Sequence, residues 1–504
     1  MMNKNKQLII NMSASFIAYA VTFGISFFLS PYIVKNVGVD AYGFVGLANN
    51  FIGYANLISV ALNSMAGRFV TVKIHQKDTE GANRYFSSVL IANLFITAFM
   101  GIVFTVLLVF LQYLINIPSN MFWDVKLLFG ALFLNCLIGT VGTIFNIATF
   151  AVNKLYLDSI RKIESNILRV VITLALFICL TPKVSYIGFT TLLCGIYVLA
   201  FNIYYTKKLL PQLKVKRKYF DLKAIIEVTL SGVWNLINRV GQLLLDGLDL
   251  LITNLLINPT SMGILSLAKT LPNIITGIIG NMVVVFSPNF TILYAEEKMD
   301  ELLASVKQSM KIMGVIANLP VIILIVCGDL FFALWQPTQD ATQLQILSVL
   351  TCGTVIFSGG INCIYNIFTV VNKLKLNSLV VIVSGVINTL CVFLLLKFTN
   401  LGIYAVAGTS TILSIIRNIV FVAPYGAICL KQKWYSFYPA MIRPVVYVTI
   451  SCILGGLFKN IISIDGWVGF IVTALVSGVL AIVIGLFIML DKNDRNIVFS
   501  KLRK

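Results

Sequence analysis

Six amide or charged side chains interrupt one apolar stretch of the sequence, residues 231–257. They are Asn235, Asn238, Arg239, Gln242, Asp246 and Asp249. Their steps of 3, 1, 3, 4 and 3 residues place all six on one helical face, which is about 21 Å long at ~1.5 Å per residue. A charge that faces lipid costs roughly 2.5–3.5 kcal/mol on insertion scales. The pattern therefore predicts a face turned to water, protein or an anionic ligand, as in the wall of a central transport cavity.

Neighbouring apolar stretches carry similar polar faces. Lys269 and Asn273 lie four residues apart, Asn49, Asn56 and Asn63 lie seven apart, and Arg417 stands beside Asn418. The alternative for the asparagines is helix–helix packing through interhelical hydrogen bonds. For Asn49, Asn56 and Asn63 the sequence favours neither alternative, whereas the depth of Arg239 in its stretch favours the cavity.

Two carboxylates in the first stretch have two possible roles. Asp246 and Asp249 are predicted at a depth in the membrane similar to that of Lys269. A buried ion pair would join a carboxylate to this lysine. Alternatively, one carboxylate binds a proton or Na⁺ that drives transport.

The composition predicts helices that cross a membrane many times. Of the 504 residues, 59% are hydrophobic and only 11% are charged, which no soluble globular protein of this length matches. We expect about fourteen transmembrane helices. The apolar runs are 7–35, 42–66, 86–113, 124–152, 163–181, 185–205, 225–257, 262–294, 308–335, 343–371, 378–397, 402–428, 441–458 and 467–490.

The net charge of +19 is explained by membrane topology and does not indicate nucleic-acid binding. Of the 38 Lys and Arg residues, 28 lie in segments on the side of the N-terminus and five lie in the opposite loops. This positive-inside bias predicts that both termini are cytoplasmic. The most basic segment, 206–224, is an orientation signal that also suits anionic lipid head groups.

Residues typical of metal, cofactor or catalytic sites are sparse. The nine cysteines form no CxxC motif, and the single histidine, His75, stands in a polar segment. We therefore expect no metal site and no cofactor. The outer loops are too short to hold an active site, so we expect a protein that is not an enzyme.

Two similarities within the chain predict a repeat. VNKLYLDS at 152–159 returns as VNKLKLNS at 371–378, and GFVGLA at 43–48 resembles GILSLA at 263–268, at offsets of 219 and 220. Six spans return the chain to the cytoplasm, so the repeats are parallel. The expected fold is an all-α polytopic membrane protein with two six-helix lobes around a central cavity. The expected parts are an N-terminal lobe 1–205, a basic linker 206–224, a C-terminal lobe 225–428, an appended helix pair 441–490 and a cytoplasmic tail 491–504.

Several segments together resemble a known family. They are SPYIVKNVGVDAYGFVGLANNF, ALNSMAGRFV, and WNLINRVGQLLLDGLDLLITNLL followed by MGILSLAKTLPNII. With the span count and the short loops, they resemble the Wzx-type polysaccharide flippases of the multidrug/oligosaccharidyl-lipid/polysaccharide exporter superfamily. Lipid II flippases of that superfamily look similar but carry cations in their first span. Here no charge precedes Lys35 in run 7–35, which argues against a peptidoglycan precursor.

The resemblance implies a function and a site. It implies alternating access, by which polyprenyl-pyrophosphate-linked oligosaccharide moves to the outer leaflet of a bacterial cytoplasmic membrane for surface polysaccharide assembly. Its partners would be undecaprenyl pyrophosphate-linked substrate, membrane lipids and other assembly proteins. Cations would hold the pyrophosphate, and amides suit sugar hydroxyls. The implied substrate-binding residues are Arg239, Lys269, Arg417, Asn235, Asn238, Gln242, Asn273, Asn49, Asn56 and Asn63.

Two other functions compete with this expectation. A multidrug or organic-cation antiporter of the same fold would use carboxylates without a deep arginine, so Arg239 counts against it while Asp246 and Asp249 keep it open. A membrane enzyme such as a glycan polymerase needs a catalytic cluster, and the sequence offers none.

Overall fold

A computed structural model describes residues 4–152, 154–284, 286–287, 290, 293–294, 296–371, 373–461, 466–491 and 495. The secondary structure over these residues is helical, with short turns between helices and no strand. Their contacts divide the chain into two compact units. Unit 1 comprises Met1–Leu243 and Leu250–Gly263, and unit 2 comprises Leu244–Asp249 and Ile264–Lys504. The all-α polytopic fold predicted from composition is confirmed.

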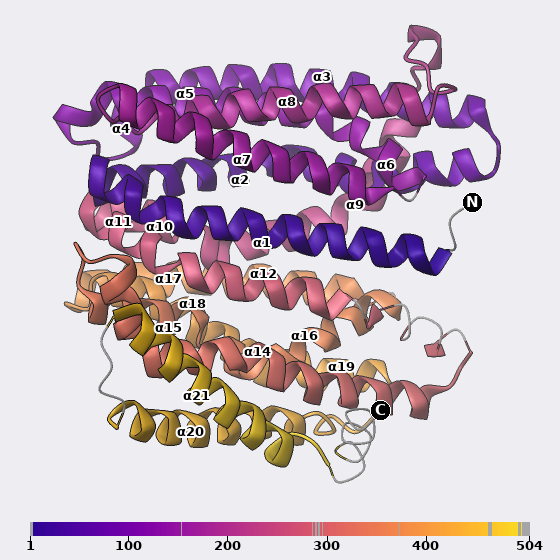
Figure 1. Ribbon diagram of the computed structural model, residues 1–504. Helices are drawn as coiled ribbons and strands as arrows, with labels where there is room; N and C mark the ends of the chain where they lie inside the picture. The colour runs from indigo at the N-terminus through magenta and orange to yellow at the C-terminus, as the bar shows by residue number, and fades with distance from the viewer. Residues whose placement is uncertain are drawn as a thin grey trace. The chain divides into compact units, whose positions relative to one another are not determined.

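Unit 1 holds the first ten helices (Figure 1). Its closest helix pairs are α5 with α8, α2 with α9, and α1 with α7. The bounds are α1 Lys4–Val37, α2 Val39–His75, α3 Thr79–Val109, α4 Leu111–Leu114, α5 Phe122–Gly142, α6 Ile147–Ala151, α7 Leu155–Cys179, α8 Ser185–Leu209, α9 Leu222–Gln242 and α10 Asp249–Leu256. Short 3-10 turns cover Ser119–Met121, Thr143–Asn146 and Arg217–Tyr219, and a π-helical turn covers Leu243–Gly247.

Unit 2 is organised around the long helix α14, which packs against α15, α16, α20 and α21. Its helices are α11 Pro259–Ala268, which begins in unit 1, α12 Thr270–Val284, α14 Met299–Trp335, α15 Ala341–Cys352, α16 Val355–Val370, α17 Leu374–Phe398, α18 Ile403–Arg417, α19 Ala423–Cys429, α20 Tyr438–Lys459 and α21 Gly466–Ile488. A second π-helical turn, Asn418–Val422, joins α18 to α19.

Twelve helical segments are long and apolar enough to cross a membrane, among the residues described. Each coincides with one of the fourteen expected runs. The other two runs are helical as well, as α7 and as α9 with α10. Charged residues such as Arg161, Lys162 and Glu164 lower the hydropathy of α7, and the π-helical turn divides the other run. The structure is therefore compatible with fourteen spans.

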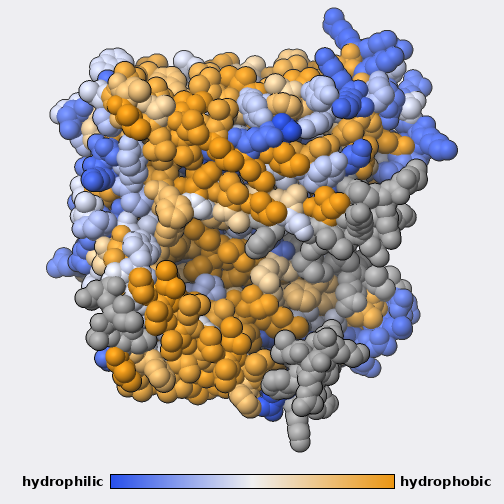
Figure 2. Space-filling view, viewed as in Figure 1, coloured by the Kyte–Doolittle hydropathy of each residue, from blue (hydrophilic) through white to orange (hydrophobic). Residues whose placement is uncertain are grey.

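The surface of the helices matches a lipid solvent. On the face shown in Figure 2, hydrophobic residues cover the middle of the helices of unit 1 and hydrophilic residues gather at their ends. On α3, Phe95, Phe99 and Ile102 are each more than half exposed, and their spacing places them on one side of the helix. Exposure of such an apolar stripe to water would be unfavourable, whereas in a bilayer the stripe faces acyl chains.

The predicted repeat has equivalent helix boundaries. Helices α7 and α17 each contain 25 residues, and they begin at Leu155 and Leu374, immediately after the matching VNK motifs. Asn153 and Asn372 of those motifs lie outside the described residues. The other pair of motifs meets in space, because a Cβ on Gly43 would lie 2.7 Å from Cα of Gly263. These boundaries are compatible with two parallel repeats.

The contact units and the predicted lobes divide the chain differently. Helix α9 belongs to unit 1 by its contacts, mainly with α2, although the sequence begins the second repeat at residue 225. Compactness and repeat symmetry are separate properties, and the lobe boundaries stay a prediction. The expected tail 491–504 lies outside the described residues apart from Asp491 and Arg495.

The expected appended pair, α20 and α21, packs on α14 through a hydrophobic cluster that includes Val326, Tyr447 and Ala481. Asp491 follows α21 and links it to α14 and α20 at one end of the cluster. It accepts hydrogen bonds from Lys311 of α14 and, at 3.0 Å, from Arg443 of α20. The hydrogen bond from Lys311 holds the pKa of Asp491 below its ordinary value of 3.8.

Asp491→Asn is expected to remove a stabilisation that depends on pH. Because the folded pKa is lowered, the stabilisation is present above the unfolded pKa and disappears as the pH falls through the folded pKa. Asp491 is half exposed, so the loss at neutral pH is at most about 1 kcal/mol. Unfolding of the detergent-solubilised variant and wild type should differ at pH 7 and differ less at about pH 3. An equal difference at both pH values would show that the carboxylate charge contributes nothing.

Candidate functional site

Helix α9 places a row of polar side chains against α2 within unit 1. The helix begins after Asp221, whose carboxylate accepts a hydrogen bond from the backbone N–H of Lys223 at 2.8 Å. Gly232 permits a close approach to α2, since a Cβ there would lie 1.9 Å from the carbonyl oxygen of Ala61. One turn further along, Asn235 donates to the hydroxyl of Ser64 on α2 at 3.2 Å.

Arg239 follows on the same face of α9, one turn beyond Asn235. Both side chains are exposed, and no hydrogen bond or ion pair of Arg239 occurs among the described residues. An arginine this far along a membrane-spanning helix would be costly in contact with lipid. Its exposure is therefore the property expected of a residue that faces water or an anion.

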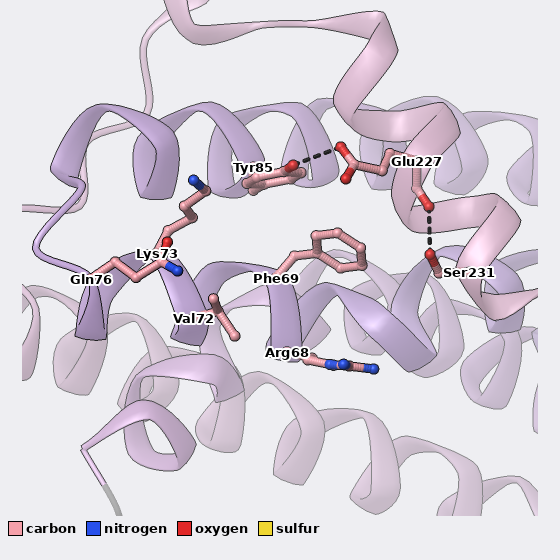
Figure 3. A pocket seen from close by; sticks show the side chains of 8 residues that line it. All are labelled: Arg68, Phe69, Val72, Lys73, Gln76, Tyr85, Glu227 and Ser231. Carbon is pink, nitrogen blue, oxygen red and sulfur yellow. Dashed lines mark hydrogen bonds between the residues drawn. The ribbon is translucent and has the colours of Figure 1, made fainter. Parts of the chain in front are cut away.

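A cavity of about 450 Å³ lies where α2 ends and where α3 and α9 begin. The positive-inside bias predicts that this end of the helices is cytoplasmic. Figure 3 shows Tyr85 of α3 reaching Glu227 of α9, and its hydroxyl donates to the carboxylate at 2.7 Å. The ring of Phe69 packs 5.2 Å from that of Tyr85, between centroids.

Two cations border this cavity, and they differ in their partners. Lys73 forms an ion pair with Asp78 at 3.0 Å. Arg68 is exposed, and the described part of the chain supplies it with no ion-pair partner. Arg68 also lies one turn from Ser64 on α2, and Ser64 accepts a hydrogen bond from Asn235 of α9. The polar side chains of the two helices therefore form one row. We call Arg68, Ser231, Ser64, Asn235 and Arg239 the polar track of unit 1.

Arg68, Glu227 and Ser231 were not predicted as site residues. The second span is predicted to end at residue 66, which places Arg68 in a cytoplasmic loop. In the structure α2 continues to His75. A usable signal existed in α9, because Glu227, Ser231, Asn235 and Arg239 recur at steps of four residues. Such a row lies along one face of a helix.

The continuous six-residue face predicted for 231–257 is wrong in one respect. The α-helix ends at Gln242, the π-helical turn covers Leu243–Gly247, and α10 starts at Asp249. A π turn adds a residue and rotates the following side chains relative to the preceding face. Asn235, Asn238, Arg239 and Gln242 therefore share α9, whereas Asp246 and Asp249 lie beyond the break.

The acidic residues beyond the break lie with Lys269 in unit 2. The ammonium of Lys269 lies 2.5 Å from the carboxylate of Asp249, and it also donates to the carbonyl oxygen of Asp246 at 3.0 Å. Asp249 is 2% exposed, whereas the side chain of Asp246 is exposed. The buried ion pair proposed from the sequence is therefore present. The amide of Asn388 donates to the carbonyl oxygen of Leu245 at 2.7 Å, which satisfies an acceptor of the π turn.

The asparagines predicted on α2 have mixed surroundings. Asn63 accepts a hydrogen bond from Asn93 of α3 at 2.9 Å, which is the interhelical packing contact that the sequence left open. Asn56 is exposed and accepts from the thiol of Cys136 at 3.4 Å. Asn49 is exposed and donates to the carbonyl oxygen of Val45 within its own helix.

The remaining predicted residues are distributed over both units. Asn238 and Gln242 are half-buried on α9, and Asn273 is exposed on α12. Arg417 ends α18 and donates to the hydroxyl of Tyr365 at 3.3 Å. The structure thus joins Asn235 and Arg239 in unit 1, and Lys269 with Asp249 in unit 2. It places Arg417 in a separate cluster of unit 2.

The fold and the twelve apolar helices among the described residues define a multi-span membrane protein. In the described part of the chain, no three His, Cys, Asp or Glu side chains group as metal ligands. The chain belongs to the polysaccharide biosynthesis protein family, whose model matches residues 8–294, more than half of its length. The solved structures that share its fold include a lipid II flippase and a multidrug transporter.

Similar proteins cover nearly the whole chain. The "uncharacterized membrane protein EpsK" of Bacillus subtilis (strain 168) is 27% identical over 502 residues, which are 98% of each chain. The lipid II flippase MurJ, in an inward closed conformation, has a TM-score of 0.71 at 13% identity and covers 98% of this chain and 100% of its own. An inward-facing multidrug resistance MATE transporter of the MOP superfamily has a TM-score of 0.67 at 16% identity, over 84% of this chain and 98% of its own. These two likenesses establish the fold.

Proposed function

We propose that the protein is a flippase for polyprenyl-pyrophosphate-linked oligosaccharide, including the undecaprenyl carriers of bacteria. It would move the repeat unit from the inner to the outer leaflet of the cytoplasmic membrane by alternating access, for surface polysaccharide assembly. Both termini would lie in the cytoplasm, as the positive-inside bias predicts. The membership in the polysaccharide biosynthesis protein family supports this class of substrate.

The polar track carries the proposal. A pyrophosphate bears roughly two negative charges and cannot cross hydrocarbon without compensation. Arg239 offers a planar fork of donors on an exposed face of α9, and this fork suits phosphate oxygens. Asn235 is also exposed one turn away, and its amide both donates and accepts, as sugar hydroxyls require.

The cavity at the start of the track suits the first encounter with the substrate. Arg68 supplies a cation at the predicted cytoplasmic end, and Gln76 and Ser231 supply polar groups that suit a glycan. From Ser231 to Arg239 the track extends eight residues along α9, about 12 Å at 1.5 Å per residue. A substrate would enter at Arg68 and move its pyrophosphate toward Arg239.

Arg239→Gln is expected to slow translocation roughly 10-fold, because a charge-assisted hydrogen bond is worth about 1.5–3 kcal/mol. The measurement is translocation of fluorescent undecaprenyl-pyrophosphate oligosaccharide in proteoliposomes, at matched amounts of folded protein. Arg217→Gln is the matched control, since Arg217 is exposed in the basic linker away from the track. It should translocate like the wild type.

The outcome separates transport from folding. Arg239 is exposed, so its variant should accumulate and melt like the wild type. If the Arg239→Gln protein fails to accumulate in the membrane, the arginine supports the fold and the track loses its central residue. If the Arg239→Gln variant translocates several glycans as fast as the wild type does, that result would also contradict the proposed role of Arg239.

An organic-cation antiporter is the second candidate, and the exposed carboxylate of Asp246 favours it. Against it, the ammonium of Lys269 lies 2.5 Å from the carboxylate of Asp249, so Asp249 is neutralised and does not attract a cation. Dye efflux that persists in Arg239→Gln but stops in Asp246→Asn would favour this antiporter over the flippase.

A further inference from the structure

A second cavity lies inside unit 1 between α5, α7 and α8, apart from the polar track. Its volume is about 340 Å³. Small residues create the space, since Gly139, Gly142 and Gly195 all line it. One water occupies roughly 30 Å³ of liquid, so the cavity has room for a phosphate group and several waters.

Two cations on one face of α7 border this cavity. Lys162 and Arg169 are seven residues apart, which is about 10 Å and two turns. Side chains on a helix tilt toward its N-terminus, so Arg169 extends back in the direction of Lys162. Lys162 pairs with Asp158 at 2.7 Å, whereas Arg169 has no carboxylate partner among the described residues.

Two residues that line this cavity each contain a buried polar atom without a partner. Nε of Arg169 and Oδ1 of Asn202 are buried, and neither has a hydrogen-bond partner. Asn202 is only 4% exposed, so bulk water does not satisfy it. Leaving such groups unpaired is unfavourable, and more so for a charged group. An acyl chain cannot meet this need, whereas a ligand with phosphate oxygens and associated water can.

The depth of the cavity matches the inner leaflet. Helix α7 starts at Leu155, at the end that is predicted to be cytoplasmic. Arg161, Lys162 and Glu164 mark the membrane interface on this helix, and Arg169 lies about 10 Å, or two turns, beyond Lys162. Arginine and lysine side chains commonly bend toward the interface from such positions. Figure 2 shows hydrophilic residues interrupting the hydrophobic surface over α7 and α8.

We infer that this cavity binds the phosphate of an anionic phospholipid from the inner leaflet. The guanidinium of Arg169 would donate to the phosphate oxygens, and Lys162 would supply a second charge at the mouth. The amide groups of Asn135 and Asn166, which also line the cavity, would bind the glycerol hydroxyls or bridging waters. Phospholipid would then be a bound component of the transporter, independent of the substrate on the polar track.

Binding of phosphatidylglycerol to the delipidated, detergent-solubilised protein tests this inference, by native mass spectrometry and by the rise in melting temperature. Wild type should retain phosphatidylglycerol in preference to phosphatidylcholine. Arg169→Gln should bind it roughly 10-fold more weakly, as expected for the loss of a charge-assisted hydrogen bond. Lys162 is exposed, so Lys162→Gln should fold normally, and it should bind a few-fold more weakly.

Controls distinguish the possible sources of phosphate. Lys183→Gln, exposed between α7 and α8 and outside the cavity, should bind phosphatidylglycerol like the wild type. Equal retention by the wild type and both cavity variants would overturn the inference. Glycerol phosphate that binds as tightly as phosphatidylglycerol would indicate a soluble ligand and overturn the phospholipid assignment. Undecaprenyl pyrophosphate that binds in its place would overturn it as well, because the cavity would then belong to the substrate.

Discussion

Lys269→Met is expected to lower the free energy of unfolding by about 3–5 kcal/mol, the loss seen when one partner of a buried ion pair is removed. The ammonium of Lys269 lies 2.5 Å from the carboxylate of Asp249, which is 2% exposed. Methionine preserves the length of the side chain but supplies no charge and no donor. Thermal unfolding of the detergent-solubilised variant should show a lower melting temperature.

The double variant Lys269→Met with Asp249→Leu is the control for this prediction. Replacing both members of a buried pair by apolar residues is often neutral for stability. The double variant should therefore recover most of the loss, and the coupling between the two sites should be large. A double variant as unstable as the sum of the single variants would contradict the ion pair as the source of stability.

The same variants decide between the two roles that the sequence allowed for the carboxylates. If Asp249 serves only the ion pair, the stable double variant should still translocate substrate. If Asp249 also binds a coupling proton or Na⁺, the double variant should fold but lose transport that is driven by an ion gradient. Measuring translocation with and without each gradient separates these outcomes.

Gly43→Leu is expected to destabilise the protein by about 3 kcal/mol, at the upper end for overpacking. A Cβ at this position would lie 2.7 Å from Cα and 2.9 Å from the backbone nitrogen of Gly263. Both neighbours are backbone atoms, so α2 and α11 would have to separate for any larger side chain to fit. The melting temperature and the yield of folded protein should both fall.

Gly53→Leu on the same helix is the matched control. A Cβ at Gly53 would meet nothing within 4 Å, and leucine has a better helix propensity than glycine by roughly 1 kcal/mol. This variant should be neutral or more stable. Equal destabilisation at both positions would mean that the backbone approach of α2 and α11 does not limit the size of residue 43.

The sequence by itself determined the helical class and the approximate spans. Membrane helices must satisfy their backbone hydrogen bonds internally, so a long apolar run is sufficient to predict one. The run 378–397, for example, lies within α17. The VNK motifs predicted the repeat but not the helix starts, because the expected runs 163–181 and 378–397 begin after α7 and α17 do, at Leu155 and Leu374.

The tertiary structure decided how the polar side chains are grouped. Spacing placed Asp249 on one face with Arg239, yet a π turn separates them, and Asp249 instead pairs with Lys269. A π turn is stabilised by distant partners such as Asn388, 143 residues from Leu245 in the chain. Periodicity within one segment contains no information about such partners.

The cavities also depended on the tertiary structure. Arg68 was assigned to a loop because the expected second span ended at residue 66, whereas α2 continues and carries it to a cavity shared with α3 and α9. Arg169 stands in the apolar run 163–181, and the residues that line the second cavity with it come largely from α5 and α8. The cost of a charge in lipid predicts that such a residue needs a polar environment. Which helices provide that environment is determined by packing between segments far apart in the chain.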